Sequence, residues 1–429
     1  MNKEILRLAI PNILSNISIP LLSTVDTVLM GTLSPRHLGA VGIGSMIFNF
    51  IYWNFGFLRM GTTGMTAQAF GAKDATEQIH NFIRAATIAI LLAIIMLFLM
   101  VPFERLSILA FNVEGDQAQL VREYFYVRIW AAPATLLIYV ISGWFFGMQN
   151  AIFPLIITIA VNIINIVASI FLVKYQGLEM KGVAMGTVIA QYLGVIMALI
   201  LFLWKYGHLR KLIDKGWKKK EAFQRFLQVN RDIFIRTIFL TLAFGFFYSK
   251  SSEAGETILA TNVILLQFLN WMSFGIDGFG YAAESLVGKY FGAKENENTR
   301  LAIKTSFIWG LALAIGFSIC YIFFFLDIIQ LFSEDTEVIQ ASLEFKWWMV
   351  LFPIIAFICY IWDGVYIGLT ASKSMRNTML LSFIVYLVSY YALLDTAPNK
   401  AIWMAMMIFL FARGLIQTVW YSKYGLEMK

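Results

Sequence analysis

Long apolar runs recur along almost the whole chain, and short polar or charged breaks separate them. A run of about 20 apolar residues is long enough to cross the hydrocarbon core of a bilayer as a helix. Reading the runs against the breaks predicts twelve transmembrane helices and hence an all-α integral membrane protein. The predicted spans are 5–30, 37–70, 80–103, 121–147, 152–173, 182–204, 231–249, 257–290, 299–325, 337–369, 377–394 and 400–422.

Short motifs repeat at one fixed offset in the sequence, which indicates two copies of one ancestral unit. FGAKD begins at Phe70, and FGAKE begins at Phe291. GWFFG at Gly143 and GVYIG at Gly364 are separated by the same distance in sequence, which we call the repeat offset. Transporters are often built from such duplicated bundles.

Each half contains six predicted spans. Because six is an even number, both halves enter and leave on the same side, and a pseudo-twofold axis along the membrane normal is expected to relate the two six-helix lobes. We predict an N-terminal lobe at 1–205, a cytoplasmic basic linker at 206–228 and a C-terminal lobe at 229–429. The linker is expected to be a solvated loop, with an amphipathic helix on the anionic inner leaflet as the alternative.

Composition and charge support this interpretation and predict an orientation. Hydrophobic residues make up 59% of the chain and charged residues only 14%. Basic residues concentrate in one set of connections, and basic loops are retained in the cytoplasm. Both termini are therefore predicted to be cytoplasmic in a multi-pass protein of the inner membrane. The same rule explains the net charge of +7, so the lipid bilayer is the expected partner and nucleic acid is not.

Residues suited to catalysis or metal binding are sparse. Cys320 and Cys359 lie within apolar spans and lack metal or redox spacing. The histidines His37, His80 and His208 are far apart, which argues against a zinc site. The sequence contains no HExxH, GxSxG or GxGD pattern. We therefore expect no enzyme activity, no cofactor and no metal beyond a sodium ion.

The first span carries a carboxylate and two prolines. Its residues 16–31 read NISIPLLSTVDTVLMG. A charged Asp26 in hydrocarbon costs about 2.5 kcal/mol or more, so it needs a partner or a change of protonation. It can then exchange a proton or hold a sodium ion, and the alternative is a residue satisfied by hydrogen bonds at the interface. Pro11 and Pro20 each remove a backbone hydrogen bond, so this helix is expected to bend.

Neutral polar side chains elsewhere in the first half are expected to surround Asp26. In the fifth span, polar residues recur at i, i+4, i+7 and i+11, on one helix face. Thr187 and Gln191 add an i, i+4 pair in the sixth span. Such residues either bind a cation or substrate, or serve as ordinary contacts between helices. The four residues of the fifth span are Thr158, Asn162, Asn165 and Ser169.

Buried acids also occur in the second half. Asp277 and Asp363 lie deep within their spans and need a partner or water. We take them, with Asn162 and Gln191, as candidates for lining a substrate cleft. The charges expected at the cleft are mostly acidic, which suits cationic cargo. Two GxxxG patterns are expected to be packing contacts between helices, at 143–147 and 364–368.

Motifs along the whole chain point to a known family. They are NISIPLLSTVDTVLMG at Asn16, FLRMGTTGMTAQAFGAKD at Phe57, VNRDIFIR at Val229, DGFGYAAE at Asp277 and WDGVYIGLTASKSMRN at Trp362. Their combination resembles the multidrug and toxic compound extrusion (MATE) transporters, in the DinF-type branch. The resemblance implies a V-shaped fold of two six-helix lobes that exports amphipathic, often cationic compounds in exchange for protons or sodium ions.

The resemblance also implies roles for single residues. Asp26 matches the family's helix-1 aspartate, whose protonation or ion binding is coupled to bending of that helix and to substrate release. Asn165 and Thr187 match the family's helix-5 asparagine and helix-6 threonine. Ser169 departs from the pattern, because an aspartate is common at this position. A cation site would then have one carboxylate, which favours a proton cycle at Asp26 but leaves sodium open.

Together these features predict a monomeric secondary active antiporter that exports amphipathic, cationic small molecules by alternating access. The main alternative is a flippase for lipid-linked saccharides or another lipid precursor, since such proteins share the wider superfamily. A strongly cationic central cleft would support the flippase.

Overall fold

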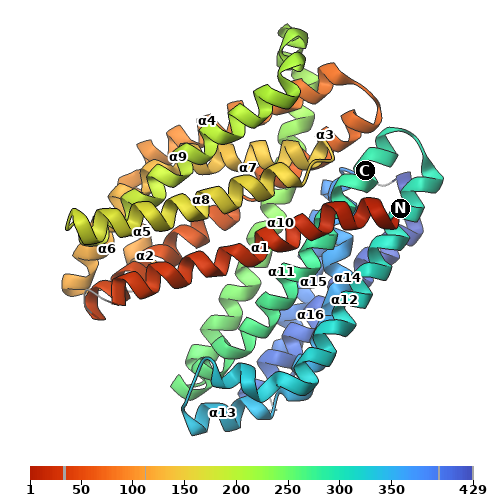
Figure 1. Cartoon of the computed structure of the whole chain (residues 1–429). Coiled ribbons are helices and arrows are strands. Elements are labelled where there is room, and N and C mark those ends of the chain that lie inside the picture. Colours follow the sequence, from red (N-terminus) through yellow and green to blue (C-terminus); the bar gives the residue numbers. More distant parts are fainter. Residues whose placement is uncertain (32–34, 112, 395–396, 428–429) are drawn as a thin grey trace. The chain divides into compact units, whose positions relative to one another are not determined.

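A computed structural model describes the backbone of residues 1–31, 35–111, 113–394 and 397–427, and their side chains except those of 19–31, 35–36 and 38. These residues form helices and no strands (Figure 1). The first half contains α1 (Asn2–Gly31), α2 (Pro35–Asn54), α3 (Phe57–Gly71), α4 (Ala75–Phe98), α5 (Met100–Ala110), α6 (Gly115–Arg128), α7 (Ala132–Gly147), α8 (Ile152–Ile170) and α9 (Glu179–Tyr206). The second half contains α10 (Lys220–Glu253), α11 (Glu256–Gly292), α12 (Asn296–Gln330), α13 (Thr336–Leu343), α14 (Lys346–Gly368), α15 (Ser372–Ala392) and α16 (Pro398–Tyr424).

The prediction of an all-α membrane protein is confirmed. Within the described residues, ten helical segments are long and apolar enough to cross a membrane. A helix overlaps every predicted span, but α1 and α15 are not among the ten, so twelve spans remain a prediction. The span predicted at 37–70 consists of α2 and α3, which a turn at Phe55 and Gly56 separates. The span predicted at 337–369 divides into α13 and α14.

The helices gather into two compact units. The N-terminal unit comprises Leu14–Leu227, and the C-terminal unit comprises Met1–Ile13 together with Gln228–Lys429. These boundaries differ from the predicted lobes, because the first helical turns belong with the second half and the linker belongs with the first. Consequently α1 and α10 each contribute residues to both units.

The beginning of α1 is fixed to the C-terminal unit by polar and close apolar contacts. The ammonium group of Lys289 and the hydroxyl of Tyr290 donate hydrogen bonds to the carboxylate of Glu4, at 2.9 and 2.7 Å. Partial burial alone would raise the pKa of Glu4, but these hydrogen bonds outweigh burial and hold the pKa below its ordinary value. Further along, Ile13 packs directly on Gly278 of α11, where a Cβ would collide with it.

Glycines set the closest helix approach in both units, and they do so in the same way. A Cβ on Gly143 of α7 would collide with the backbone carbonyl of Arg59 on α3. A Cβ on Gly364 of α14 would collide with the backbone carbonyl of Gly280 on α11. The repeat offset relates the two glycines, and it also relates their two partners. The GxxxG patterns are therefore packing contacts, as predicted, and the sequence repeat is also a repeat of contacts.

The turns of the two halves are related by the same repeat offset. Lys73 and Lys294, which follow α3 and α11, have positive φ angles of 57° and 60°. Gln149 and Thr370, which follow α7 and α14, have φ angles of 61° and 53°. Non-glycine residues seldom adopt this left-handed conformation. Its recurrence at equivalent positions of both halves supports the duplication independently of the motifs.

The basic linker is anchored to α4 rather than free in solvent. It forms two short 3₁₀ helices, η3 (Gly207–Leu212) and η4 (Lys215–Lys218). The guanidinium group of Arg84, which is 1% exposed, donates to the backbone carbonyl of Trp217 at 2.9 Å and to the carboxylate of Glu77 at 2.6 Å. Nε2 of His80 lies 3.1 Å from Oδ1 of Asp214. The linker therefore contains short helices held against α4, but most of its residues, including its lysines, are exposed, as expected of a solvated segment.

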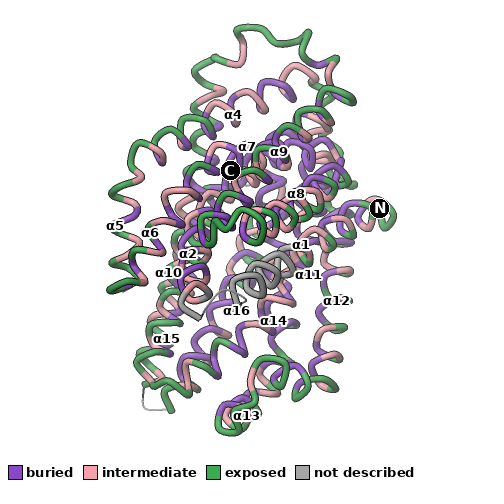
Figure 2. The backbone as a smooth tube through the Cα atoms, turned by 60° about the vertical axis from the view of Figure 1, so that its left-hand side comes forward, coloured by how far each residue is buried: buried purple, intermediate pink, exposed green. Residues whose placement is uncertain are grey.

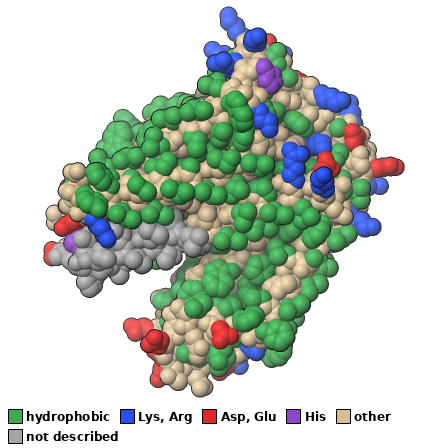
Figure 3. Space-filling model, viewed as in Figure 1, with side chains coloured by type: hydrophobic (Ala, Val, Ile, Leu, Met, Phe, Trp, Pro, Cys, Tyr) green, Lys and Arg blue, Asp and Glu red, His purple; other side chains and the backbone are tan. Residues whose placement is uncertain are grey.

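Charge and exposure within the C-terminal unit follow the pattern of a membrane protein. Lysine and arginine side chains gather around the end where the two termini lie, whereas acidic side chains appear around α13 (Figure 3). Apolar side chains along α12, such as Ile308, Ile315 and Phe323, are exposed by 55, 43 and 73% (Figure 2). Exposed apolar surface of this extent suits contact with lipid.

Candidate functional site

The polar face predicted on the fifth span lies on α8 and contacts α1 inside the N-terminal unit. The hydroxyl of Ser15 donates to the hydroxyl oxygen of Thr158 at 3.1 Å. One turn further on, the amide nitrogen of Asn162 donates to the backbone carbonyl and to Oγ of Ser18, at 3.2 and 3.1 Å. The later residue of α1 contacts the later residue of α8, so the two helices run parallel here.

The second half of the same face contacts α9 and forms a buried network. Nδ2 of Asn165 donates to Oγ1 of Thr187 at 2.8 Å, and Oγ of Ser169 donates to Oδ1 of Asn165 at 3.4 Å. The exposed fractions of Asn165, Ser169 and Thr187 are only 1, 1 and 7%. The structure therefore brings together the three neutral residues predicted for the cation site. Gln191 is half-buried one turn further along α9.

Local backbone features mark this end of α8. The helix passes directly into a π-helical turn, η2 (Phe171–Tyr175), in which the amide of Gln176 donates to the carbonyl of Phe171 at 3.3 Å. Such turns occur frequently at functional sites. On α9, Gly186 lies against Ser169, and a Cβ there would be 2.8 Å from the backbone nitrogen of Ser169. The absence of a side chain at Gly186 lets α8 and α9 approach closely enough for the network.

We expect Gly186→Ala to impair transport more than an ordinary glycine substitution. The added methyl group must push α8 and α9 apart beside Ser169, and overpacking of this kind typically costs about 1–3 kcal/mol. Efflux and thermal stability of the purified protein would be measured. Gly42→Ala is the matched control, since a Cβ at Gly42 meets nothing within 4 Å. Equal efflux in the two variants would mean that the close approach is not needed.

Part of the predicted first-helix chemistry is outside the described side chains. This applies to Asp26 and Pro20, so coupling and bending at these positions remain predictions. Pro11 lies within the continuous helix α1. Next to it, the buried side chain of Asn12 donates to the carbonyl of Leu8 at 2.8 Å.

A second polar cluster lies inside the C-terminal unit and is centred on Asp363 of α14. Oδ2 of Asp363 accepts hydrogen bonds from the guanidinium groups of Arg236 on α10 and Arg413 on α16. Oδ1 accepts a hydrogen bond from the amide of Gln417 at 2.9 Å. The exposed fractions of Arg236, Arg413 and Gln417 are 4, 2 and 1%. One carboxylate thus ties three helices together through buried, charge-assisted bonds.

The surroundings of this cluster balance its charge. Asp277 of α11 lies close enough to Arg236 and Tyr360 to interact electrostatically with both. The guanidinium carbon of Arg413 lies 5.9 Å from the centre of the Tyr360 ring, within the range of a cation–π contact. Two arginines therefore accompany the two acids predicted for the cleft. The charges of this cluster are thus not mostly acidic, and its place in a substrate cleft stays a prediction.

The two polar clusters do not follow the repeat offset that relates the helices. In the second half, the positions equivalent to Asn165 and Ser169 carry Tyr386 and Tyr390. In the first half, the positions equivalent to Asp363 and Arg413 carry Ser142 and Tyr192. The duplicated scaffold has thus kept its packing glycines and turns while the two halves have acquired different chemistry.

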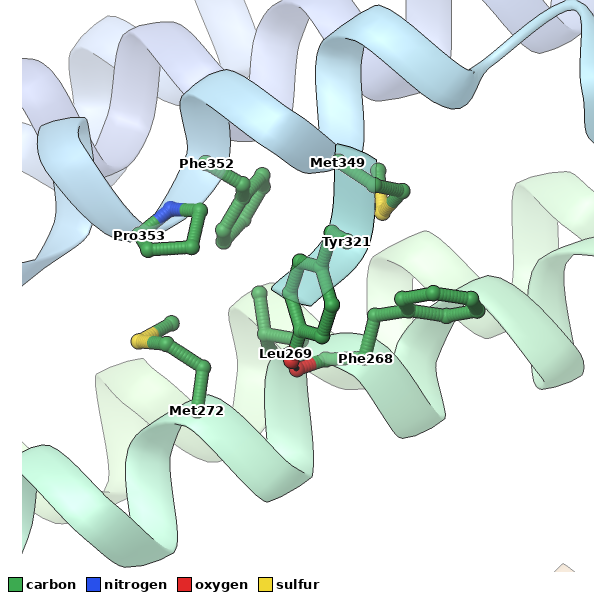
Figure 4. A pocket seen from close by; sticks show the side chains of 7 residues that line it. All are labelled: Phe268, Leu269, Met272, Tyr321, Met349, Phe352 and Pro353. Carbon is green, nitrogen blue, oxygen red and sulfur yellow. Dashed lines mark hydrogen bonds between the residues drawn. The ribbon is translucent and has the colours of Figure 1, made fainter. Parts of the chain in front are cut away.

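An apolar gap in the C-terminal unit is not a candidate for binding polar molecules. It lies between α11, α12 and α14 and has no room for a water molecule (Figure 4). The hydroxyl of Tyr321 donates to the carbonyl of Phe268 at 2.5 Å. The residues that line the gap are Phe268, Leu269, Met272, Tyr321, Met349, Phe352 and Pro353.

Comparison with known proteins identifies the family. The MatE family model matches residues 11–171 and 233–392. DNA damage-inducible protein F of Escherichia coli is 33% identical over 430 residues, which cover 98% of this chain and 92% of that protein. The chain belongs to the MatE family. The probable multidrug resistance protein NorM of Thermotoga maritima is 24% identical over 80% of this chain and 74% of that protein.

The fold is that of MatE-family transporters of known structure. A crystal structure of a MATE protein in the bent conformation superimposes with a TM-score of 0.89, covering 98% of this chain and 94% of that chain at 17% identity. The two MatE matches include Asn165 and Asp363 but end before Thr187 and Arg413. Each polar cluster therefore combines residues inside and outside the segments that define the family.

Sequence reasoning missed the basic partners of Asp363. Arg236 and Arg413 are single charges within the apolar spans predicted at 231–249 and 400–422. Charged residues within membrane helices almost always pair with one another, so the presence of Asp363 in another span was a usable signal. Ser18 and Gly186 were also missed, because their roles depend on which helix faces meet.

Proposed function

We propose that this MatE-family chain is a secondary active antiporter that exports amphipathic, cationic small molecules in exchange for protons or sodium ions. The observation that carries the proposal is the buried network of Asn165, Ser169 and Thr187 between two helices of membrane-spanning length. Buried polar groups in such helices are costly and mark ion or substrate pathways. The T. maritima relative named as a probable multidrug resistance protein supports the export of drugs.

Alternating access between two six-helix lobes is the proposed mechanism. The repeated glycine contacts and turns support two lobes of common ancestry. We retain six spans in each lobe, twelve in all, and an even number of spans in each lobe is consistent with a pseudo-twofold axis along the membrane normal. The basic side chains around the termini support a cytoplasmic location of both ends in the inner membrane. We retain the expectations of a monomer and of no cofactor besides the coupling ion.

Asp26 is the proposed coupling residue. The described contacts pair Ser15 with Thr158 and Ser18 with Asn162 as α1 and α8 run in parallel. This register, continued for two further turns, would bring position 26 level with Ser169. The carboxylate would then meet the neutral oxygens of the network. A lone carboxylate among neutral oxygens favours a proton, because desolvation promotes the neutral form, while the same oxygens can also serve a sodium ion.

Transport by purified protein in liposomes tests this function. Uptake or release of a cationic dye would be followed while a proton gradient and a sodium gradient are imposed separately. We expect the proton gradient to drive dye movement, and the sodium arm to show whether sodium can substitute. Failure of both gradients to drive transport would contradict antiport. The balanced charges around Asp363 do not provide the strongly cationic site that would favour a flippase.

A further inference from the structure

A basic hollow lies at the end of the C-terminal unit, between the beginning of α12 and the end of α16. Its volume is about 440 Å³, and it is open to the surroundings. Arg300 and Lys304 are one turn apart on the same face of α12 and supply two positive charges. The positive φ of 57° at Gly425 turns the chain as α16 ends. The hollow is lined by Arg300, Ile303, Lys304, Tyr421, Ser422 and Gly425.

Aromatic packing holds Tyr421, one of the lining residues, against the neighbouring helices. The ring of Trp362 on α14 lies 5.0 Å from that of Phe307 on α12 and 4.8 Å from that of Tyr421 on α16. The indole N–H of Trp362 also donates to Thr418 at 2.7 Å. Trp362 therefore lies between α12 and α16 and keeps them apart at this level. The hollow therefore lies beside three helices, α12, α14 and α16, that are packed together by specific contacts.

An apolar stripe continues from the hollow along the same helices. On α12, Ile308, Leu311 and Ile315 follow Lys304 at i+4, i+7 and i+11 and are exposed by 55, 39 and 43%. On α16, Leu415 and Phe411 are exposed by 50 and 52%. A ligand that matches this surface has an anionic head and an apolar body.

We propose that the hollow binds the phosphate head group of one anionic phospholipid from the cytoplasmic leaflet, with its acyl chains on the apolar stripe. Arg300 and Lys304 supply the charge, and the hydroxyl of Tyr421 lines the same hollow, whereas that of Ser422 donates to the backbone carbonyl of Val419 at 3.3 Å. Glu297 and Glu427 lie nearby in sequence but do not line the hollow. The exposed apolar stripe favours a lipid over free phosphate. This inference is independent of the transported cargo and the coupling ion.

Lipid titration of the full-length protein tests the site. The thermal unfolding midpoint would be measured in neutral detergent micelles doped with phosphatidylglycerol or phosphatidylcholine. We expect phosphatidylglycerol to raise the midpoint. Each basic residue near an anionic membrane surface contributes about 1 kcal/mol to binding. Replacing both residues, by Arg300→Gln with Lys304→Gln, should therefore raise about 30-fold the fraction of phosphatidylglycerol that gives half of the increase in the unfolding midpoint.

Matched variants separate this site from general charge attraction. Lys218→Gln with Lys219→Gln makes the same charge change in the linker and should leave the lipid response unchanged. Arg300→Lys with Lys304→Arg keeps both charges and should retain most of it. The proposal is overturned if the variant with glutamine at positions 300 and 304 responds to phosphatidylglycerol like the wild type. It is also overturned if the variant with glutamine at positions 218 and 219 loses the response to the same extent. An equal shift with inorganic phosphate alone would also overturn the lipid assignment.

Discussion

Energised efflux is expected to fall to the level of cells without the protein when Asp26→Asn is introduced. The network assigned to the site, Asn165, Ser169 and Thr187, consists of neutral groups that do not titrate in the physiological range. Coupling to a proton therefore requires the carboxylate that we propose beside them. Asparagine keeps the size of the side chain and its ability to form hydrogen bonds, but it cannot take up and release a proton.

Drug efflux from intact cells and gradient-driven transport in liposomes would both be measured for this variant. Glu123→Gln is a suitable control, because Glu123 in the same unit lies 3.6 Å from Lys181 in an exposed ion pair that contributes little. It changes the net charge by the same amount away from the network. Wild-type efflux by Asp26→Asn would remove the coupling role. Lost efflux together with a lowered melting temperature would instead indicate a defect of folding.

Asp363→Ala is expected to destabilise the protein by about 3–5 kcal/mol, since breaking one side of a buried ion pair leaves a charge without compensation. Here two guanidinium groups, those of Arg236 and Arg413, depend on the same carboxylate. Gln417 would also lose its acceptor. Thermal or denaturant unfolding in mild detergent, together with the yield of folded protein, measures the effect.

A second substitution tests the cause of that loss. Arg413→Met in the Asp363→Ala background removes one of the two uncompensated charges and should restore part of the stability, giving a coupling energy in a double-mutant cycle. Lys346→Met, at the beginning of α14, is the control for loss of a positive charge away from the cluster and should restore nothing. A loss below about 1 kcal/mol for Asp363→Ala would show that water or other groups solvate the arginines.

Most of the helical architecture could be predicted from the sequence, because lipid imposes long apolar runs that are easy to recognise. The breaks within predicted spans were harder to predict. The turn at Phe55 and Gly56, which separates α2 from α3, contains no charged residue that would mark it in the sequence. The turn that separates α13 from α14 lies at Glu344 and Phe345, within a single predicted span. The anchoring of the linker was also hidden, because Arg84 of α4 reaches Trp217 across 133 positions of the sequence.

The candidate site was predictable to the extent that it follows helix periodicity. The spacing of Asn162, Asn165 and Ser169 was sufficient to place them on one face of α8, and Thr187 meets that face as expected. Periodicity does not reveal which charges in separate helices meet. The pairing of Asp363 with Arg236 and Arg413 required the packing of α10, α14 and α16, so the acids were foreseen without their counterions.

The division of α1 between two compact units has a mechanical consequence. Its residues up to Ile13 belong to one unit, and from Leu14 onward it belongs to the other. If the two units move relative to one another in the transport cycle proposed above, the residues from Pro11 to Leu14 are where α1 is expected to bend, because the helix passes there from one unit to the other. The stiffness of this short segment would then contribute to the work that each cycle requires.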